Sequence, residues 1–264
     1  MWKLCAVALL LHVLLVPALG LTVSVVIPAL CRNLQKTFLV TALSIAHQIE
    51  RPDEVVVVAS GCETAEAEGL RQLYANILAP IPLVLFDVEH IQHEAISRNA
   101  GADLSSGDII MFIDADDFMV PEYVQAIMGI FKKTGAHMVL HGYSGRHVLC
   151  ADRRPKISRD SAALHEIEIK TRSRQKHLTL DIHHAQGSFK REVTQWVRYK
   201  SVGGEDSVYV RAAVVELHKR KLEFVYTTAK LSVYTPSKRQ KQPGFLLKHL
   251  FLLFKYLQAP CNPP

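Results

Sequence analysis

Three aspartates stand close together near the middle of the chain, in the run Asp114-Ala115-Asp116-Asp117. They follow five consecutive apolar residues, Ile109 to Ile113, and such a run predicts a buried strand. Ligands of an open α/β sheet bind outside the carboxyl ends of its strands. Because Asp114 and Asp116 are two residues apart, an extended segment projects both to one side, where a divalent cation would relieve their repulsion. Oxygen-only ligands suit Mg²⁺ or Mn²⁺, usually with substrate phosphates in the shell, so the run predicts a metal site.

The ordinary alternative is that these aspartates begin a helix. Pro121 suits the first helical position, and acidic residues are favourable near helix N-termini. One aspartate would fit that explanation well. Three at one strand end, after a segment that carries Arg98, favour the metal site instead.

A second group of acids lies in the run Gly203-Gly204-Glu205-Asp206-Ser207. The glycine pair is expected to deliver both acids to the start of a helix that runs to about Lys219. Acids in a first turn complement the helix dipole, which by itself accounts for their presence.

The spacing of several motifs resembles that of family-two glycosyltransferases. The relevant runs are Arg98-Asn99-Ala100-Gly101, Gly107-Asp108-Ile109-Ile110, the aspartate run, and the opening patterns V-S-V-V-I-P and S-I-A-H-Q-I-E-R-P-D-E-V-V-V-V. Those enzymes have a nucleotide-sugar-binding α/β fold called GT-A. In that fold a strand-end D-x-D motif holds a divalent metal against the sugar nucleotide's diphosphate. The resemblance extends from Thr22 to about Ser237.

The resemblance implies a role for individual residues. Asp114 and Asp116 are expected to hold the metal, and Asp206 to be the general base of an inverting single displacement, because G-E-D resembles the family's catalytic acid motif. Glu205 is the reserve base, or it orients the acceptor. The acceptor is expected to be a hydroxyl of a glycan, lipid or protein. The residues expected to contact the nucleotide-sugar donor are Pro28, Ala29, Ser60, Arg98, Asn99 and Asp114.

One segment departs from the family pattern. Most members carry an Asp pair followed by Gly-Ser after the second strand, and one of those acids contacts the base. This chain reads Ala59-Ser60-Gly61-Cys62 instead. The missing carboxylate argues against a fixed preference for uridine. It also keeps open the alternative of a non-catalytic nucleotide- or sugar-binding protein on the same fold.

The elements around these motifs predict the α/β class. The resemblance makes the expected fold a GT-A-like, Rossmann-type three-layer sandwich with a mixed, mainly parallel sheet. The first unit is a strand, a helix capped by Asn33 and a second strand, which should pack parallel and right-handed. The strands are expected at Val23–Pro28, Val55–Ala59, Leu83–Phe86, Ile109–Ile113, Met138–Gly142 and Leu231–Tyr234. The helices are expected at Leu34–Gln48, Glu63–Asn76, Glu94–Ala102 and Val120–Lys133.

Several histidines have the chemistry of metal ligands. His141 and His147 are nevertheless expected to be satisfied structural histidines. The segment from Ala151 to Asp181 is polar, basic and aperiodic, which predicts a variable connection with a functional or unstructured character. His183-His184 follows it, but adjacent residues of a strand face opposite sides, so a metal or acceptor role for His184 is the less favoured interpretation.

Composition bounds the remaining function classes. The 264 residues can bury one large core, and 31 basic against 25 acidic residues give a net charge of +6, which suits an anionic substrate or a membrane surface. No nucleic-acid motif is recognisable, so no nucleic-acid partner is expected. A dinucleotide oxidoreductase is disfavoured because no G-x-G-x-x-G follows the first strand.

The N-terminal segment predicts the cellular compartment of the protein. Residues 1–20 are expected to form a signal peptide: Lys3 precedes a stretch from Leu4 to Val16 that is apolar apart from His12, and Ala18-Leu19-Gly20 suits cleavage. An uncleaved signal anchor is the alternative, although the stretch is short for a span of about 20 residues. The expected compartment is the secretory pathway, either the ER and Golgi lumen or outside the cell.

The remaining boundaries place a GT-A domain at 21–240 and an amphipathic helix and tail at 241–264. Residues 243–257 would lie on a membrane surface or cover the edge of the sheet. Cys31, Cys62, Cys150 and Cys261 remain after removal of the signal, and either a disulfide or buried free thiols fit them.

Overall fold

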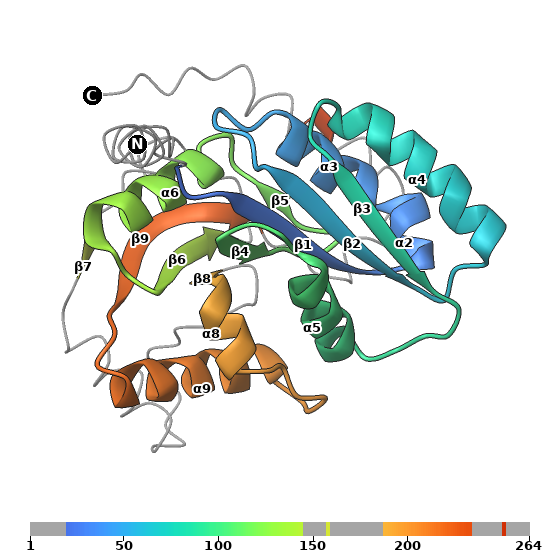
Figure 1. Ribbon diagram of the computed structural model, residues 1–264. Helices are drawn as coiled ribbons and strands as arrows, with labels where there is room; N and C mark the ends of the chain where they lie inside the picture. Colours follow the sequence, from blue (N-terminus) through green and yellow to red (C-terminus); the bar gives the residue numbers. More distant parts are fainter. Residues whose placement is uncertain (1–19, 145–156, 159–186, 234–249, 252–264) are drawn as a thin grey trace, which may run out of the picture.

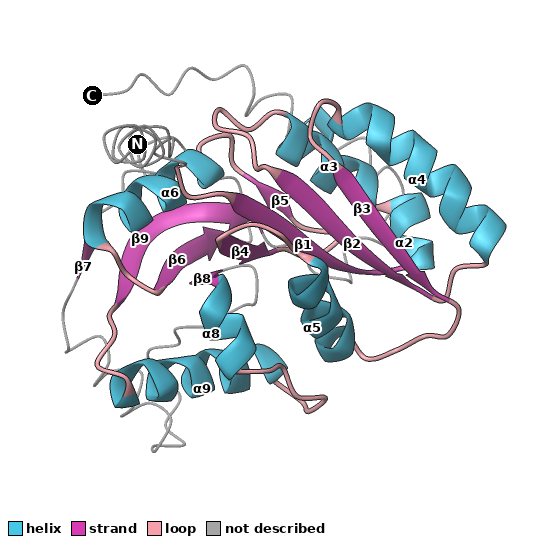
Figure 2. Cartoon of the chain, in the orientation of Figure 1, coloured by secondary structure: helices cyan, strands magenta, loops and turns pink. Residues whose placement is uncertain are grey.

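The computed structural model describes residues 20–144, 157–158, 187–233 and 250–251 (Figure 1). Strands and helices alternate through the first half of the chain (Figure 2). The strands are β1 (Val23–Leu30), β2 (Glu54–Ser60), β3 (Leu83–Val88), β4 (Ile109–Phe112), β5 (Phe118–Met119), β6 (Met138–Ser144), β7 (Ile157–Ser158), β8 (Gly187–Lys190) and β9 (Phe224–Val233). The helices are α2 (Cys31–Lys36), α3 (Phe38–Ala46), α4 (Thr64–Leu78), α5 (Glu94–Leu104), α6 (Tyr123–Thr134), α8 (Arg191–Trp196) and α9 (Glu205–Lys219).

All described strands belong to one sheet in the order β3-β2-β1-β4-β8-β6-β9-β5, with β7 also paired to β9. The ladders between β1, β2, β3 and β4 are parallel, and so is the ladder between β6 and β9. β8 runs antiparallel between β4 and β6, and the two-residue strands β5 and β7 pair antiparallel to β9. The parallel ladders are the longer ones, so the expected mixed, mainly parallel sheet is confirmed.

Helices cover both faces of this sheet (Figure 2), which makes the three-layer sandwich that the sequence predicts. β1 and β2 are apolar on both faces because each face is covered. Val25, Val57 and Met111 face the layer of α2, α3, α4 and α6. Val26 and Val56 face the layer of α5, α8 and α9, with Phe112 and Phe189.

Helix α5 lies unusually close to β1 at Gly101. A Cβ atom there would stand 2.4 Å from Val26 Cγ1. Glycine is therefore needed for a close approach of helix and strand rather than for an unusual backbone angle. Arg98 lies one turn earlier on the same side of α5, because residues three apart share a helix face.

The amino ends of the central strands are joined by a group of polar contacts, which we call the amino-end network. Its members are the buried residues Ser24, Glu54 and Gly107 and the exposed Ser106. Ser24 Oγ donates to Glu54 Oε1 at 2.6 Å and accepts from Gly107 N at 2.7 Å. The Ser106 amide also donates to Glu54 Oε1. Burial would raise the pKa of Glu54, but the hydrogen bonds from Ser106 and Ser24 outweigh it, and the pKa lies below the ordinary value.

The helix expected at Leu34–Gln48 is broken in two, and Asn33 is not its cap. Thr37 separates α2 from α3 with φ −119° and ψ −29°. Its hydroxyl donates to Asn33 O at 3.1 Å and contacts Ala115 O at 3.2 Å. The break follows from these contacts, which replace a continuous helix with a link to the aspartate run.

The prediction for Pro121 is also wrong. Glu122 is the N-cap of α6 and Tyr123 its first residue, so the helix begins after the proline. The reason is that β5, which the sequence analysis missed, extends pairing with β9 up to Val120, whose amide donates to Leu231 O at 3.0 Å. β9 itself is longer at its start than the strand expected at Leu231–Tyr234.

Some predictions fall outside the described residues: the signal segment, His147, His183-His184 and nearly all of 151–181 and 243–257. Among the described helices, none combines the length and apolar character that a membrane crossing needs. His141 is the structural histidine expected, since it is buried and its ring bonds to the Tyr123 hydroxyl at 3.0 Å and to Gly142 O at 2.8 Å.

Candidate active site

A cleft opens at the carboxyl ends of β1, β2 and β4, beside the start of α5. Its empty volume is about 390 Å³ when the space open to solvent is included. The strand order reverses between β1 and β4, and α/β sheets bind ligands at such a switch point. The lining residues are Pro28, Ala29, Leu30, Asn33, Ser60, Gln92, Glu94, Ser97, Asp114, Ala115 and Asp116.

The aspartate run forms a turn after β4. One carboxylate oxygen from each of Asp114, Asp116 and Asp117 lies within 4.8 Å of the others. The Asp117 amide closes the turn onto Asp114 O at 3.1 Å, and the Thr41 hydroxyl donates to Asp117 O at 2.6 Å. The acids therefore converge because the chain turns here, and Thr41 of α3 holds that turn. The prediction that an extended segment projects Asp114 and Asp116 to one side is wrong.

Helix capping does not explain these acids, because α6 begins at Tyr123 and has no side-chain cap. Asp114 and Asp116 line the cleft, whereas Asp117 is 1% exposed and lies behind them. A set of oxygen donors at this separation fits a hard divalent cation such as Mg²⁺ or Mn²⁺.

Arg98 is fully buried on α5, at 0% exposure. Its Nη2 lies 3.0 Å from Asp114 Oδ1, its Nη1 contacts Glu205 Oε1, and Nη1 lies 3.8 Å from Asp206 Oδ1. We call Arg98, Asp114, Glu205 and Asp206 the Arg98 cluster. Burial alone would lower the pKa of Arg98, but the carboxylates, Asp114 foremost, raise it above its ordinary value. Arg98 does not line the cleft and instead holds the acids beside it.

Glu205 and Asp206 open α9, as the sequence predicts, after Gly204 with φ +70°. They complement the helix dipole, but they also converge on Arg98. Burial raises the pKa of Glu205, and the charges of Arg98 and His93 oppose that rise.

His93, at the N-cap of α5, is a site residue that the sequence analysis missed. Its Nδ1 lies 3.0 Å from Glu205 Oε2 and 3.2 Å from the Ala95 amide. The two contacts compete, because the amide needs a lone pair on Nδ1 and the carboxylate needs a proton there. No motif surrounds His93, and only the folded contact reveals its place in the site.

Two residues expected at the donor have other partners. The amide of Asn99 donates to Tyr199 O and accepts from Tyr199 N, both at 3.0 Å, and Asn99 is not part of the cleft lining. Ser60 does line the cleft, but its hydroxyl accepts from Gln92 N at 2.9 Å and contacts His90 O at 3.3 Å. Ser60 thus holds the loop before α5 and shapes the cleft wall.

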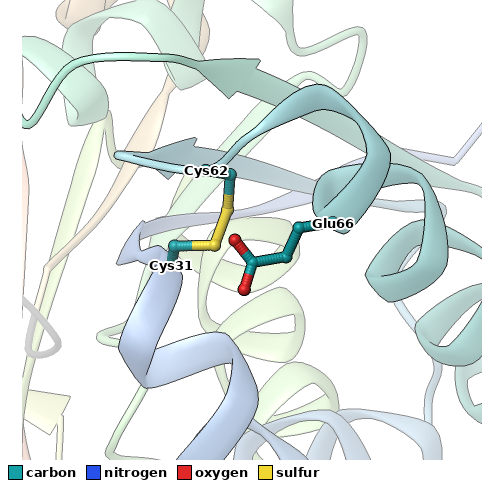
Figure 3. A group of neighbouring side chains, drawn as sticks. All are labelled: Cys31, Cys62 and Glu66. Carbon is teal, nitrogen blue, oxygen red and sulfur yellow. A yellow bond between two sulfur atoms is a disulfide. The ribbon is translucent and has the colours of Figure 1, made fainter.

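A disulfide joins the buried residues Cys31 and Cys62 (Figure 3). Cys31 directly follows β1, and Cys62 comes two residues after the end of β2. The two cysteines are 31 residues apart in sequence, and their Cα atoms are 5.1 Å apart. Glu66 lies beside the sulfur atoms in Figure 3 and accepts from Gln35. Since each sulfur is bonded to the other, this group is a cross-link in the present oxidised form rather than a metal site.

The sheet, the switch-point cleft and the acidic turn together define an α/β protein of the GT-A fold class. The model of the family Glycosyl transferase family 2 matches residues 24–195. The match spans more than half of the sequence, and the chain therefore belongs to glycosyl transferase family 2.

Individual relatives support the same placement. "Uncharacterized glycosyltransferase YwdF" of Bacillus subtilis (strain 168) is 31% identical over 99 residues, which is 38% of this chain and 32% of that protein. The chain thus matches about a third of that relative's length.

Solved structures share the fold. S. aureus TarS 1-349 in complex with UDP-GlcNAc matches with a TM-score of 0.61 and 17% identity, over 90% of this chain and 67% of that one. The mannosyltransferase PcManGT from Pyrobaculum calidifontis, in complex with GDP-Man and Mn²⁺, matches with a TM-score of 0.57 and 17% identity, over 94% and 67%. At this identity the likeness shows the fold alone.

Proposed function

We propose that this protein is an inverting glycosyltransferase that moves a sugar from a nucleotide-sugar donor to a hydroxyl of a glycan, lipid or protein. The observation that carries the proposal is the Arg98 cluster. It brings the acid after β4 and the acids at the start of α9 to one buried guanidinium beside the cleft. An inverting transfer needs a charge-stabilising group at the leaving diphosphate and a base at the acceptor.

Asp114 and Asp116 would hold a divalent cation, because both line the cleft and their oxygens lie close together. The bound cation would neutralise charge on the leaving diphosphate. Pro28, Ala29 and Ser60, from the ends of β1 and β2, form the cleft wall where the donor nucleotide would lie.

Asp206 is better suited than Glu205 to act as general base. A base must offer a lone pair to the acceptor's proton. The carboxylate of Glu205 contacts both Arg98 and His93, and its side chain is 10% exposed. Asp206 is 20% exposed, and its distance to the guanidinium is the longer 3.8 Å. With Asp206 as the base, the role that we propose for Glu205 is to hold Arg98 and to orient the acceptor.

The proposed step is a single displacement. Asp206 accepts the hydroxyl proton while the acceptor oxygen forms a bond to the anomeric carbon. The bond between that carbon and the diphosphate oxygen breaks, and its electron pair leaves with the nucleoside diphosphate. Attack opposite the leaving group inverts the configuration at the anomeric carbon.

The test is a transfer assay with purified full-length chain, Mn²⁺ and a panel of nucleotide sugars and acceptors. We expect turnover with at least one pair and donor binding that depends on the metal. Calorimetry of that donor with and without chelator measures the dependence, and Asp116→Ala should abolish it. Equal donor affinity in both conditions would contradict metal assistance.

A second candidate is a non-catalytic nucleotide- or sugar-binding protein. Its support is that β2 ends in Ala59-Ser60 without the family's carboxylate, and that Ser60 is engaged with the neighbouring loop. This candidate predicts donor binding in calorimetry with no transfer across the whole panel.

We also propose that the protein matures in the secretory pathway. The Cys31–Cys62 disulfide supports this location, because disulfides persist in oxidising compartments. Peripheral membrane contact through residues 243–257 remains part of the proposal. N-terminal sequencing of protein from its native host should find a start near Leu21, and a retained Met1 in a soluble cytosolic fraction would contradict it.

A further inference from the structure

The side chain of Arg98 connects two parts of the site that sequence places far apart. Glu205 lies 107 residues after Arg98, and Asp114 lies 16 residues after it. The two ends of the guanidinium are divided between them: Nη2 faces Asp114 at 3.0 Å, and Nη1 contacts Glu205. A fork of two nitrogen donors suits this geometry, whereas a lysine ammonium is a single point charge.

Several acids surround Arg98 in the described part of the chain. Glu94 lies 3.7 Å from Nη2 and Asp206 lies 3.8 Å from Nη1, so four carboxylates surround one guanidinium. Among the described residues, His93 lies beside Glu205, and the centroid of the Tyr199 ring is 5.4 Å from Arg98 Cζ. Because Arg98 is fully buried, its interactions are only weakly screened by solvent. Its positive charge must therefore be shared among the acids.

We propose that Arg98 is a positioning residue that couples the cation affinity of Asp114 to the charge of the acid pair at the start of α9. This inference rests on the proposed function. With the Glu205 carboxylate in place, Arg98 is drawn toward α9 and opposes a cation at Asp114 less. With a neutral side chain at that position, the guanidinium is left to Asp114 and competes with the cation. The donor side and the acceptor side of the site are thereby linked through one side chain.

A double-mutant cycle tests the coupling with Mn²⁺ alone as the probe. Calorimetry gives the Mn²⁺ affinity of wild type, Glu205→Gln, Arg98→Met and the double variant, each checked for folding by circular dichroism. Loss of a nearby negative charge weakens Mn²⁺ binding through space in either background. We expect the weakening caused by Glu205→Gln to be at least about fivefold greater when Arg98 is present, the lower end of typical coupling between sites.

Further variants guard against an unfolded Arg98→Met protein. The double variant removes one charge of each sign, so it keeps the net charge of the wild-type cluster. Arg98→Lys keeps the charge without the fork, and it should show coupling smaller than wild type. Asp103→Asn is the matched control: it removes an acid from the same helix that pairs with Arg198 and not with Arg98. It should leave Mn²⁺ affinity unchanged.

The outcomes separate the two proposals. An equal effect of Glu205→Gln in the wild-type, Arg98→Lys and Arg98→Met backgrounds, in variants that fold, overturns the coupling while the proposed function stands. No binding of Mn²⁺ alone by wild type overturns the coupling, whereas metal assistance is judged separately by donor affinity with and without chelator. A purely structural arginine would change melting temperature without changing the ratio of Mn²⁺ affinities.

Discussion

Acids at the two ends of the central sheet differ in their partners and in the direction of their pKa shifts. In the amino-end network, the Glu54 carboxylate accepts hydrogen bonds from Ser24 and Ser106, which are neutral donors. In the Arg98 cluster, carboxylates from the end of β4 and the start of α9 compete for one guanidinium. The pKa of Glu54 is lowered from its ordinary value, whereas the pKa of Glu205 is raised.

The difference separates an acid that serves the fold from acids that serve a reaction in the proposed function. Each hydrogen bond to Glu54 joins strands or the loop before β4, and nothing further is required of that carboxylate. The acids around Arg98 repel one another, and such conflicts persist where chemistry needs charged groups close together. Variants at the two ends should therefore fail in different ways.

The largest expected effect is on turnover, at the carboxyl end. Asp206→Asn keeps the size of the side chain but removes its basicity, and loss of a positioned general base costs about 10²–10⁴-fold in rate. Donor affinity should change far less, because Asp114 and Asp116 remain. Turnover, donor affinity and melting temperature are measured on the same variant.

A different result is expected if Asp206 only complements the dipole of α9. Asp206→Asn would then lose about 0.3–1 kcal/mol of stability and keep its turnover. Transfer by Asp206→Asn at a near wild-type rate would remove the base assignment and move it to Glu205.

At the amino end, Glu54→Gln should reduce stability and leave turnover unchanged. Hydrogen bonds to a charged group contribute about 1.5–3 kcal/mol, and the glutamine loses part of this. Because the folded pKa of Glu54 lies below its ordinary 4.5, its charge stabilises the fold above that pH and the contribution is lost as pH falls through the folded value. Urea denaturation at pH 7 and below 4.5 should therefore show a difference that shrinks in acid.

Glu205 gives the opposite pH trend. Its folded pKa is raised, so the burial penalty of its charge is present at neutral pH and is relieved as pH falls through that folded value. Relative to wild type, Glu205→Gln should therefore lose stability as pH falls, whereas the deficit of Glu54→Gln shrinks. Parallel acid dependence of both variants in urea denaturation would contradict the contrast between the two ends.

Gly107→Ala should also destabilise the amino end. A Cβ atom at this position would lie 2.6 Å from Ser24 N, a backbone atom that cannot move alone. Overpacking of this kind costs about 1–3 kcal/mol, measured by chemical denaturation. Gly129→Ala in α6 is the control, because nothing lies within 4 Å of its added Cβ, and it should be neutral or stabilising.

The smallest effect is expected for an exposed ion pair. Arg198 contacts both Asp103 oxygens at 2.6 Å, but the two side chains are 40% and 59% exposed. Asp103→Asn should cost about 0.2–1 kcal/mol, and less in high salt. A loss as large as that of Glu54→Gln would show that burial is not what distinguishes these acids.

The fold was predictable where its signals are local. β1, β2 and β4 are apolar runs, and α4, α5 and α9 have local start signals or helical periods, so their boundaries fall within a few residues of expectation. The short strands β5 and β8 were missed because two to four residues carry no period. Their pairing with β9, β4 and β6 is decided by the assembled sheet.

The site was predictable in its residue types more than in its contacts. Asp114, Asp116, Glu205 and Asp206 were identified from motifs, and the structure brings their segments together. The convergence of Asp114, Glu205 and Asp206 on Arg98 was not predicted, since it depends on how α5 and α9 pack on one face of the sheet. The pairing of Cys31 with Cys62 was likewise open, because sequence spacing does not determine which cysteines meet.

The close contact of Gly101 with Val26 has a consequence for genetics. An alanine there would push α5 away from β1, since its Cβ would stand 2.4 Å from the valine methyl. Arg98 is fixed to the same face of that helix and would be drawn back from Asp114. A screen for loss-of-function alleles should therefore recover Gly101, although it touches neither an acid of the site nor the cleft.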